Sequence, residues 1–309
     1  MKVLLCYFSG TGNTKKVVDK YVEAFNKNDA TVDVYKIEEY NFNYKIEDYD
    51  MIGFGYPVHA FNAPSIILKF AKTLPKVNTT KNVFIIKTSG EPLKLNNISS
   101  LKLTKILKRK GYKVTNEYHY VMPYNIIFRH TDNMAYKMWQ AAENVVPIDC
   151  KEILDEKKSL LKRVFLGGLL AWVFRIEFWG GRFNGKRYKV NENCVHCNRC
   201  VNTCPMHNIT IENGEFHFGK NCIMCMRCSF YCPRNAIKIG LFEKWKVNGA
   251  YNFNNKNDNE EDKHKKYCKK SYIKYFAKCE EKIKSAQVSA ATETSHETKD
   301  DDVEDTVSA

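Results

Sequence analysis

Eight of the twelve cysteines lie between Cys194 and Cys232. They form the pattern C-x2-C-x2-C-x3-C-P twice, and the second copy follows the first at an offset of 28 residues. Thiolates are soft ligands, and loops this short wrap around an iron–sulfur cluster while the fourth cysteine reaches into the neighbouring cluster. The spacing therefore predicts two [4Fe–4S] clusters with exchanged fourth ligands. The predicted ligand sets are Cys194, Cys197, Cys200 and Cys232 for cluster 1, and Cys222, Cys225, Cys228 and Cys204 for cluster 2.

A pair of zinc sites is the alternative, because C-x2-C is also a zinc-ribbon spacing. Zinc ribbons use widely separated cysteine pairs, whereas here three closely spaced cysteines and a fourth before proline occur twice. The motif resembles that of bacterial two-cluster ferredoxins, and this resemblance implies a small α+β domain built from two similar halves. The N-terminus carries no signal-peptide pattern, so we expect a cytoplasmic protein whose thiols remain reduced.

A second candidate site lies near the N-terminus, where the sequence SGTGNT (Ser9–Thr14) follows an apolar run and opens a helical pattern. Glycine permits a tight turn, and hydroxyl and backbone N–H groups can surround a phosphate at the positive end of the helix. The chain lacks the P-loop pattern G-x-x-x-x-G-K-[ST], and its GxGxxK loop departs from the dinucleotide fingerprint. The loop therefore favours a mononucleotide.

The segment YFSGTGNT resembles the phosphate loop of the flavodoxin family, which holds flavin mononucleotide (FMN) at the sheet edge. Two later loops, Gly55–Pro64 and Thr88–Pro92, lie where flavodoxins enclose the isoalloxazine ring. Thr88–Pro92 has no aromatic residue, so Tyr124 or Asn125 is a candidate to cover the second face of the ring. The flavin-binding residues implied by the resemblance are Ser9, Thr11, Gly12, Asn13, Thr14, Tyr56, Pro57, Val58, His59, Ala60, Phe61, Thr88, Ser89, Gly90 and Glu91.

The first 150 residues alternate strand and helix patterns, which predicts an α/β fold with a doubly wound, five-stranded parallel sheet of flavodoxin type. The predicted strands are Lys2–Tyr7, Thr31–Ile37, Met51–Gly55, Val83–Thr88 and Lys113–Val121. The predicted helices are Thr14–Asn26, Pro64–Thr73 and Ser99–Lys110. A further helical pattern follows Asp132 and is interrupted at Pro147, where a new helix can start.

These patterns divide the chain into six parts. The predicted parts are an FMN-binding domain (1–150), a helical connector (151–185), a ferredoxin-like domain with two [4Fe–4S] clusters (186–245), a linker (246–262), an amphipathic helix (263–285) and a disordered acidic tail (286–309). The tail has almost no large apolar residue, so burial cannot offset the entropy of ordering it. The remaining cysteines, Cys6, Cys150, Cys268 and Cys279, are expected to be packing residues.

The net charge of +14 is concentrated in residues 151–250, which hold 17 Lys and Arg against 8 Asp and Glu. A basic surface favours an acidic partner, and without a nucleic-acid recognition motif we expect no nucleic-acid binding. Residues 157–189 could lie on an anionic membrane, but a helix buried between the two domains is the favoured interpretation. The side chains expected to dock an acidic redox protein are Lys186, Arg187, Lys189, Arg199, Arg227 and Arg234.

Residues 1–245 together resemble flavodoxin–ferredoxin fusion proteins found mainly in anaerobes. The resemblance implies an electron carrier that passes electrons between FMN and two [4Fe–4S] clusters. The alternative is an FMN-dependent reductase of a nicotinamide, a quinone or another small acceptor, although the chain shows no separate nicotinamide-binding domain. The sequence leaves the donor, the acceptor, the direction of electron flow and the oligomeric state open.

Overall fold

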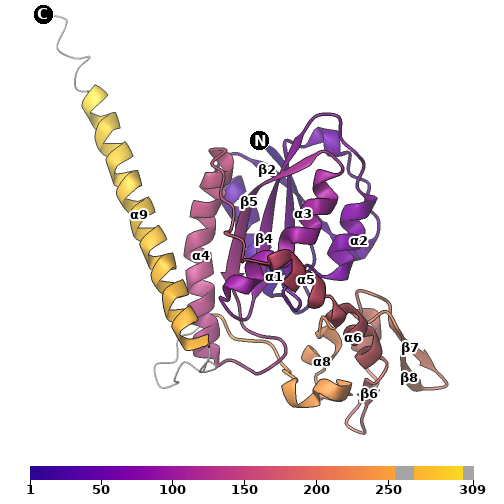
Figure 1. The fold of residues 1–309 in the computed structure, drawn as a ribbon. Coiled ribbons are helices and arrows are strands. Elements are labelled where there is room, and N and C mark those ends of the chain that lie inside the picture. The colour runs from indigo at the N-terminus through magenta and orange to yellow at the C-terminus, as the bar shows by residue number, and fades with distance from the viewer. Residues whose placement is uncertain (255–267, 302–309) are drawn as a thin grey trace, which may run out of the picture.

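The computed structural model describes residues 1–254 and 268–301. Its main element is a parallel sheet of five strands in the order β2-β1-β3-β4-β5 (Figure 1). This is the strand order of flavodoxin-like sheets, so the predicted fold class of the first domain is confirmed. The strands are β1 (Lys2–Tyr7), β2 (Thr31–Lys36), β3 (Met51–Pro57), β4 (Lys81–Ser89) and β5 (Tyr112–Val121).

Helices cover both faces of the sheet, which explains why the central strands are almost continuously apolar and buried. Helices α2 and α3 pack on one face, and α1 and α4 pack on the other. The loops hold 3-10 turns η1 (Ile37–Glu39), η2 (Ile46–Asp48) and η3 (Lys94–Ser100). The four helices are α1 (Asn13–Asn26), α2 (Ser65–Thr73), α3 (Leu101–Lys108) and α4 (Asp132–Leu154).

Helix α4 runs through Pro147 without a break, so the predicted new helix start at this residue is wrong. Proline removes a single backbone donor, and this loss is tolerated where packing holds the helix in place. Val145, Val146 and Cys150 are all buried against the sheet beside that position. The tertiary contacts of α4 therefore outweigh the local effect of proline.

The connector differs from the expected buried helix. After α4, the backbone of Ser159 runs beside β5, donating to the Thr115 carbonyl at 3.1 Å and accepting from the Glu117 N–H at 2.7 Å. Two short helices follow, α5 (Gly167–Val173) and α6 (Ile176–Gly185). Phe165, with 86% of its surface exposed, illustrates that most large apolar side chains here face outward. The interpretation of this segment as an interdomain helix with a buried apolar centre is therefore wrong.

The cysteine-rich domain consists of two similar halves and packs at the carboxyl end of the sheet (Figure 1). Its short strands form two antiparallel pairs, β6 with β9 and β7 with β8. The elements are β6 (Lys189–Val190), α7 (Arg199–Asn202), β7 (Ile209–Glu212), β8 (Glu215–Phe218), α8 (Arg227–Phe230), β9 (Ile237–Lys238) and the 3-10 turn η4 (Gly240–Trp245).

The segment after η4 is not a free linker over residues 246–254. Val247 and Tyr251 are buried, and the Asn248 side-chain amide donates to the carbonyls of Ser229 at 2.7 Å and Cys232 at 3.0 Å. Arg129 of the first domain donates to the Gly249 carbonyl at 2.6 Å. Residues 246–254, which we call the strap, therefore contact both domains. Residues 255–262 of the predicted linker lie outside the described range.

Helix α9 (Lys269–Asp301) packs against the outer side of α4 and extends beyond the sheet (Figure 1). It overlaps the predicted amphipathic helix over residues 269–285 and continues through residues 286–301, for which the sequence predicts disorder. Helix propagation adds one backbone hydrogen bond per residue once a turn is formed, so an anchored helix can extend beyond its buried part. Tail residues 302–309 and helix residues 263–267 lie outside the described range.

Within residues 1–254 and 268–301, no helix is both long enough and apolar enough to cross a bilayer.

Gly53 in β3 tests the packing between the sheet and its neighbours. An added Cβ would lie 2.4 Å from the Phe84 ring and 2.5 Å from a Leu5 methyl group. Gly53→Ala should lower the free energy of unfolding by about 1–3 kcal/mol, because the added methyl group would overpack the core. Gly168→Ala, with open space around the added methyl group, should leave stability unchanged or raise it by about 0.5–1 kcal/mol. Urea denaturation followed by circular dichroism measures both, and equal stabilities would contradict this packing.

Candidate functional site

The loop after β1 forms the first wall of a cavity at the carboxyl end of the sheet. The Ser9 hydroxyl accepts the N–H groups of Gly12 and Lys15 at 3.2 Å each, which caps the start of α1. Gly12 has φ 96°, a conformation that glycine adopts without strain. The Thr14 hydroxyl lies 2.8 Å from the Thr88 hydroxyl and ties this loop to the end of β4. The positive end of α1 thus faces the cavity.

The loop after β3 forms the second wall. The Val58 N–H donates to the Thr88 carbonyl at 2.8 Å, and His59 and Asn62 exchange two backbone hydrogen bonds. Ala60 and Phe61 have φ of 40° and 60°, so the chain turns sharply at the cavity edge. Pro57, Val58, His59, Ala60 and Phe61 all line the cavity, as the sequence predicted.

Tyr56 is a correction to the predicted flavin contacts. Its side chain is fully buried in the core beneath α2 and does not line the cavity. Successive side chains of a strand point to opposite faces of the sheet, so Tyr56 and Pro57 cannot both face the cavity. Gly12 also lies off the cavity wall, and a Cβ added there would lie 3.1 Å from the Tyr231 hydroxyl of the second domain.

The loop after β4 forms the third wall and is held by polar contacts. The Ser89 hydroxyl donates to the Glu91 carbonyl at 2.6 Å, and the Asn96 amide donates to the same carbonyl at 2.8 Å. A Cβ added to Gly90 would lie 2.2 Å from the Tyr124 ring, so this aromatic ring packs directly on the Gly90 backbone. The Tyr272 hydroxyl of α9 donates to the Gly90 carbonyl from the other side.

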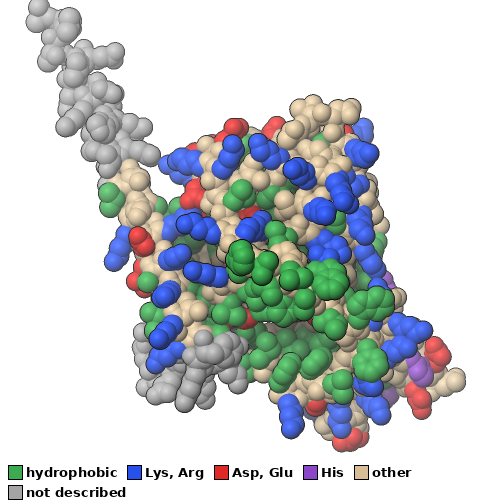
Figure 2. All heavy atoms as spheres, viewed as in Figure 1, with side chains coloured by type: hydrophobic (Ala, Val, Ile, Leu, Met, Phe, Trp, Pro, Cys, Tyr) green, Lys and Arg blue, Asp and Glu red, His purple; other side chains and the backbone are tan. Residues whose placement is uncertain are grey.

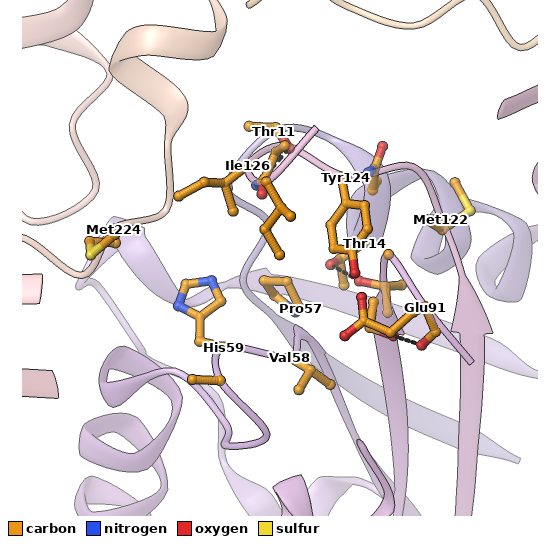
Figure 3. Close-up of a pocket in the computed structure, with 18 of the residues that line it drawn as sticks. Thr11, Thr14, Pro57, Val58, His59, Glu91, Met122, Tyr124, Ile126 and Met224 are labelled. Carbon is orange, nitrogen blue, oxygen red and sulfur yellow. Dashed lines mark hydrogen bonds between the residues drawn. The ribbon is translucent and has the colours of Figure 1, made fainter. Parts of the chain in front are cut away.

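These loops enclose a cavity of about 410 Å³, within the size range of cofactor sites. Thirteen of the fifteen residues implied by the flavodoxin resemblance line it, and Tyr124 and Asn125 line it as well. In Figure 3, Met224 lies at one end of the cavity, Glu91 lies at the other, and His59 and Pro57 lie between them. The lining residues that sequence analysis missed are Gly10, Asn96, Met122, Pro123, Ile126, Ile127, Glu177, Gly180, Gly181, Met224, Phe242 and Trp245.

Two carboxyl groups in the cavity wall have perturbed acidities. Burial raises the pKa of Glu91 to about 7 and that of Glu177 to about 7. Oε2 of each side chain has no hydrogen-bond partner among the described residues. Burial lowers the pKa of His59 to about 4, against the opposing effect of its hydrogen bond to the Ile223 backbone, so this imidazole is neutral at pH 7. The wall therefore offers polar groups for a ligand or a proton.

The cysteine-rich domain repeats its backbone conformation as well as its sequence. Three pairs of residues 28 positions apart adopt positive φ: His196 and Met224, Asn198 and Met226, and His207 and Asn235. Four backbone N–H groups donate to cysteine sulfurs in the same repeating arrangement. The N–H of His196 donates to the Cys194 sulfur and that of Met224 to the Cys222 sulfur, both at 3.4 Å. The N–H of Asn208 donates to the Cys204 sulfur at 3.4 Å, and that of Ala236 donates to the Cys232 sulfur at 3.1 Å.

The eight cysteines of the repeat line two small cavities. One cavity is lined by Cys204 together with Cys222, Cys225 and Cys228. The other is lined by Cys194, Cys197, Cys200 and Cys232, and also by Cys228. Across the described ranges, no group of three or more His, Cys, Asp or Glu side chains is arranged to hold a metal ion. The cysteines outside these sets, Cys6, Cys150, Cys268 and Cys279, are buried packing residues as expected.

Arg227 joins the cysteine-rich domain to the loop after β1. Its guanidinium donates to the carbonyls of Ser9 at 2.6 Å and Gly10 at 2.9 Å, and it forms a two-pronged ion pair with Glu38 at 2.7 and 3.0 Å. Only 12% of the Arg227 side chain and 5% of the Glu38 side chain are exposed. Arg227 is therefore not a docking residue for an external partner, which corrects the expectation from sequence.

The two domains also touch through their backbones. A Cβ added to Gly10 would lie 2.5 Å from the Cys225 carbonyl, so the phosphate-loop candidate packs directly on a cysteine loop. The Asn125 amide lies within 3.4 Å of the same carbonyl and 3.2 Å from the Thr11 hydroxyl. The Tyr231 hydroxyl donates to the Thr11 carbonyl at 2.8 Å. The wall of the cavity is therefore in direct contact with the loop that carries Cys225, a member of the predicted cluster-2 set.

Replacing Arg227 tests this contact. Arg227→Met removes the ion pair and the donors to three backbone carbonyls, those of Ser9, Gly10 and Thr203, so the free energy of unfolding should fall by about 3 kcal/mol. Adding Glu38→Gln should restore a small part of the loss at most, because the Glu38 carboxylate that the first substitution leaves behind still pairs with Lys36 at 2.6 Å. Arg199→Met, at an exposed position, is the matched control. Chemical denaturation measures all four proteins, and an Arg227→Met variant as stable as the parent would show that the contact contributes little.

The first domain is similar to known proteins. A family model described as flavodoxin domain matches residues 4–123. An uncharacterized protein of Methanocaldococcus jannaschii is 32% identical over 119 residues, covering 38% of this chain and 73% of the relative.

Three solved structures are among those similar to this part of the chain. Oxidised flavodoxin 1 from Bacillus cereus is 14% identical, with a TM-score of 0.36, covering 49% of this chain and 98% of its own. A flavodoxin from the domain Archaea is 14% identical, with a TM-score of 0.34, covering 50% and 99% respectively. NAD(P)H:quinone oxidoreductase from Methanothermobacter marburgensis is 12% identical, with a TM-score of 0.36, covering 48% and 94%. Through its N-terminal domain, residues 4–123, the chain belongs to the flavodoxin domain family.

Proposed function

We propose that the chain is an electron-transfer protein that passes electrons between FMN, bound in the cavity at the sheet edge, and two [4Fe–4S] clusters in residues 186–245. The observation that carries this proposal is the shared wall between the two sites. The loop that bears Cys222 and Cys225 also supplies Met224 to the cavity, and its Cys225 carbonyl packs on Gly10. A flavin exchanges electrons either in pairs or one at a time, whereas an iron–sulfur cluster exchanges them one at a time. A protein that holds both groups can therefore couple a two-electron reaction to one-electron carriers.

The cavity residues suit FMN. Hydroxyl and backbone groups of Ser9, Thr11 and Thr14 stand at the positive end of α1, where a phosphate is favoured. The loops after β3 and β4 offer apolar side chains and backbone groups for a flat ring. Tyr124 lies beside them, and its buried hydroxyl has no partner among the described residues. A bound flavin would satisfy such orphaned polar groups.

The two cysteine sets suit iron–sulfur clusters. Each cavity is bordered by four thiols from the predicted set, and thiolates are the ligands that hold such clusters. The N–H groups directed at Cys194, Cys204, Cys222 and Cys232 stabilise sulfur that carries negative charge. A cytoplasmic location accords with this assignment, because a reducing compartment keeps eight clustered cysteines available as ligands.

The arrangement gives the two clusters different positions in a relay. The cluster-2 set adjoins the flavin cavity, whereas Cys197 of the cluster-1 set is exposed. We therefore place cluster 2 between FMN and cluster 1, with cluster 1 exchanging electrons with a protein partner. Exposed basic side chains on this domain, including Arg199, Arg234 and Lys238, favour an acidic redox protein.

A reductase that acts on a small acceptor is the second candidate. The carboxyl groups of Glu91 and Glu177 line the cavity, and burial brings the pKa of each to about 7. Either could deliver a proton to an acceptor near neutral pH, which a pure electron carrier does not need. Steady-state assays with NADH, NADPH and quinones separate the two functions, since a carrier shows negligible turnover without its protein partner.

Substitution of the loop threonines tests FMN binding. Thr11→Ala with Thr14→Ala removes two donors to a phosphate, each worth about 1.5–3 kcal/mol when the bond is charge-assisted. The affinity for FMN should fall by more than about tenfold, while the iron content stays the same. Thr79→Ala with Thr80→Ala, in an exposed loop before β4, is the control. Fluorescence titration with FMN gives the dissociation constants, and equal affinity for both double variants would place the phosphate elsewhere.

Removal of one ligand from each cluster tests the relay. After anaerobic reconstitution, Cys225→Ser and Cys197→Ser should each lose or convert one cluster, as measured by iron, sulfide and electron paramagnetic resonance. Cys225→Ser should also slow electron exchange between FMN and the remaining cluster, because the nearer cluster is missing. Cys197→Ser should retain rapid exchange between FMN and cluster 2. Full iron content in either variant, or equal exchange rates in both, would overturn the assignment.

A further inference from the structure

Helices α5 and α6 present an apolar face that nothing in the described structure covers. Figure 2 shows hydrophobic side chains gathered over these helices, with Lys and Arg around them. The exposed fractions are large, reaching 86% at Phe165 and 72% at both Ile176 and Trp179. We call this surface the α5–α6 face, and its exposed apolar side chains are Phe165, Leu166, Leu169, Trp172, Val173, Ile176, Trp179 and Phe183.

The opposite side of α5 anchors it to the first domain. Ala171 is 1% exposed, and Gly167 is also buried. A Cβ added to Gly167 would lie 2.8 Å from the Ile98 side chain, so the helix lies close against the end of η3. The small residues thus face the protein and the large ones face outward. An apolar helix with this orientation needs a second apolar environment.

The charges around the α5–α6 face are almost all positive. Residues 157–189 contain nine Lys and Arg and one acidic residue, Glu177, which lines the flavin cavity. Arg182 and Arg187 lie over the rings of Trp179 and Phe183, with their guanidinium carbons 5.6 and 3.7 Å from the ring centroids. Exposed positive charge thus surrounds exposed aromatic surface. The exposed basic residues are Lys157, Lys158, Lys162, Arg163, Arg182, Lys186, Arg187 and Lys189.

We propose that the α5–α6 face lies on the surface of an anionic lipid bilayer. Phenylalanine, leucine and tryptophan side chains enter the boundary between head groups and acyl chains, while lysine and arginine remain at the anionic head groups. A protein partner fits less well. Lysine, which occurs five times in residues 157–189, is depleted in protein interfaces.

Membrane binding orients the electron-transfer site. Helix α6 contributes Glu177, Gly180 and Gly181 to the wall of the flavin cavity, so this wall lies next to the lipid. Phe61 of the cavity also packs edge-on against Phe174, between α5 and α6, with 4.8 Å between ring centroids. The bilayer contact therefore lies beside the cavity, while the exposed Cys197 belongs to the other cluster set.

Vesicle sedimentation with the cofactor-loaded full chain tests the proposal. The chain should bind vesicles of phosphatidylcholine mixed with phosphatidylglycerol, and bind vesicles of phosphatidylcholine alone much more weakly. Phe165→Ser with Trp179→Ser should weaken binding by at least about tenfold, because two large apolar side chains are lost from the lipid. Lys162→Glu with Lys186→Glu should weaken binding by at least about fivefold per charge.

Matched controls come from α9, on the other side of the first domain (Figure 1). Ile273→Ser removes an apolar side chain that is 59% exposed, and Lys274→Glu with Lys278→Glu reverses two exposed charges. Neither control should alter vesicle binding. Quenching of tryptophan fluorescence by brominated lipid supplies a second readout, and Trp172→Phe with Trp179→Phe should abolish most of it.

Three outcomes would overturn the proposal. The first is no binding to anionic vesicles, and the second is equal binding by the Phe165/Trp179 variant and the parent. The third is a concentration-dependent dimer or a complex with a protein that Trp179→Ser dissociates, because the face would then be a protein interface. FMN and iron contents should be the same in every variant, so failure of this proposal is distinguishable from failure of the proposed electron transfer.

Discussion

The buried contact between Arg227 and the loop after β1 fixes the cysteine-rich domain against the first domain. One guanidinium donates to two backbone carbonyls of that loop and to the Glu38 carboxylate. A rigid, planar side chain with several donors is suited to such a junction, because each bond fixes the direction of the others. The Cys225 backbone is consequently held against Gly10, so the loop that carries Cys222 and Cys225 lies against the wall of the cavity at the sheet edge.

The same contact places the two similar halves of the cysteine-rich domain in different surroundings. Arg199 occupies in the first half the position that Arg227 occupies in the second, 28 residues later. Arg199 is exposed and lies 5.2 Å from the centre of the Tyr231 ring, whereas Arg227 is buried at the junction. The internal repeat thus supplies two equivalent cysteine sets, and the junction places one beside the cavity at the sheet edge and leaves the other near the surface. Under the proposed function, this asymmetry would give the relay an inner and an outer cluster.

The cavity depends on distant segments for its shape. Tyr272 of α9 donates to the Gly90 carbonyl and lies 3.2 Å from the His130 imidazole, so the C-terminal helix supports the loop after β4. The strap after η4 acts similarly, since the Tyr251 hydroxyl donates to the Tyr124 carbonyl at 2.7 Å. Tyr124, which packs on Gly90, is therefore held by residues far along the chain. Loops that bind a flat cofactor need such support, because their own backbone has few internal contacts.

Much of this protein could be predicted from sequence because the relevant signals are local. Strand and helix periodicity predicted the five parallel strands, and the glycine and hydroxyl residues of Ser9–Thr14 predicted an anion-binding turn. Cysteine spacing predicted two ligand sets, and the structure gathers the same eight thiols around two cavities. These features depend on residues close in sequence or on an exact internal repeat.

Other features were decided by contacts between residues far apart in sequence. The burial of Arg227 depends on Glu38, and the orientation of Tyr56 depends on which side chain of β3 meets the core. The passage of α4 through Pro147 likewise depends on burial against the sheet. The outward face of α5 and α6 was missed because an apolar run has the same composition whether it faces a core or solvent. Sequence determined which residues could do chemistry, and tertiary packing decided which of them meet, because packing alone sets distance and burial.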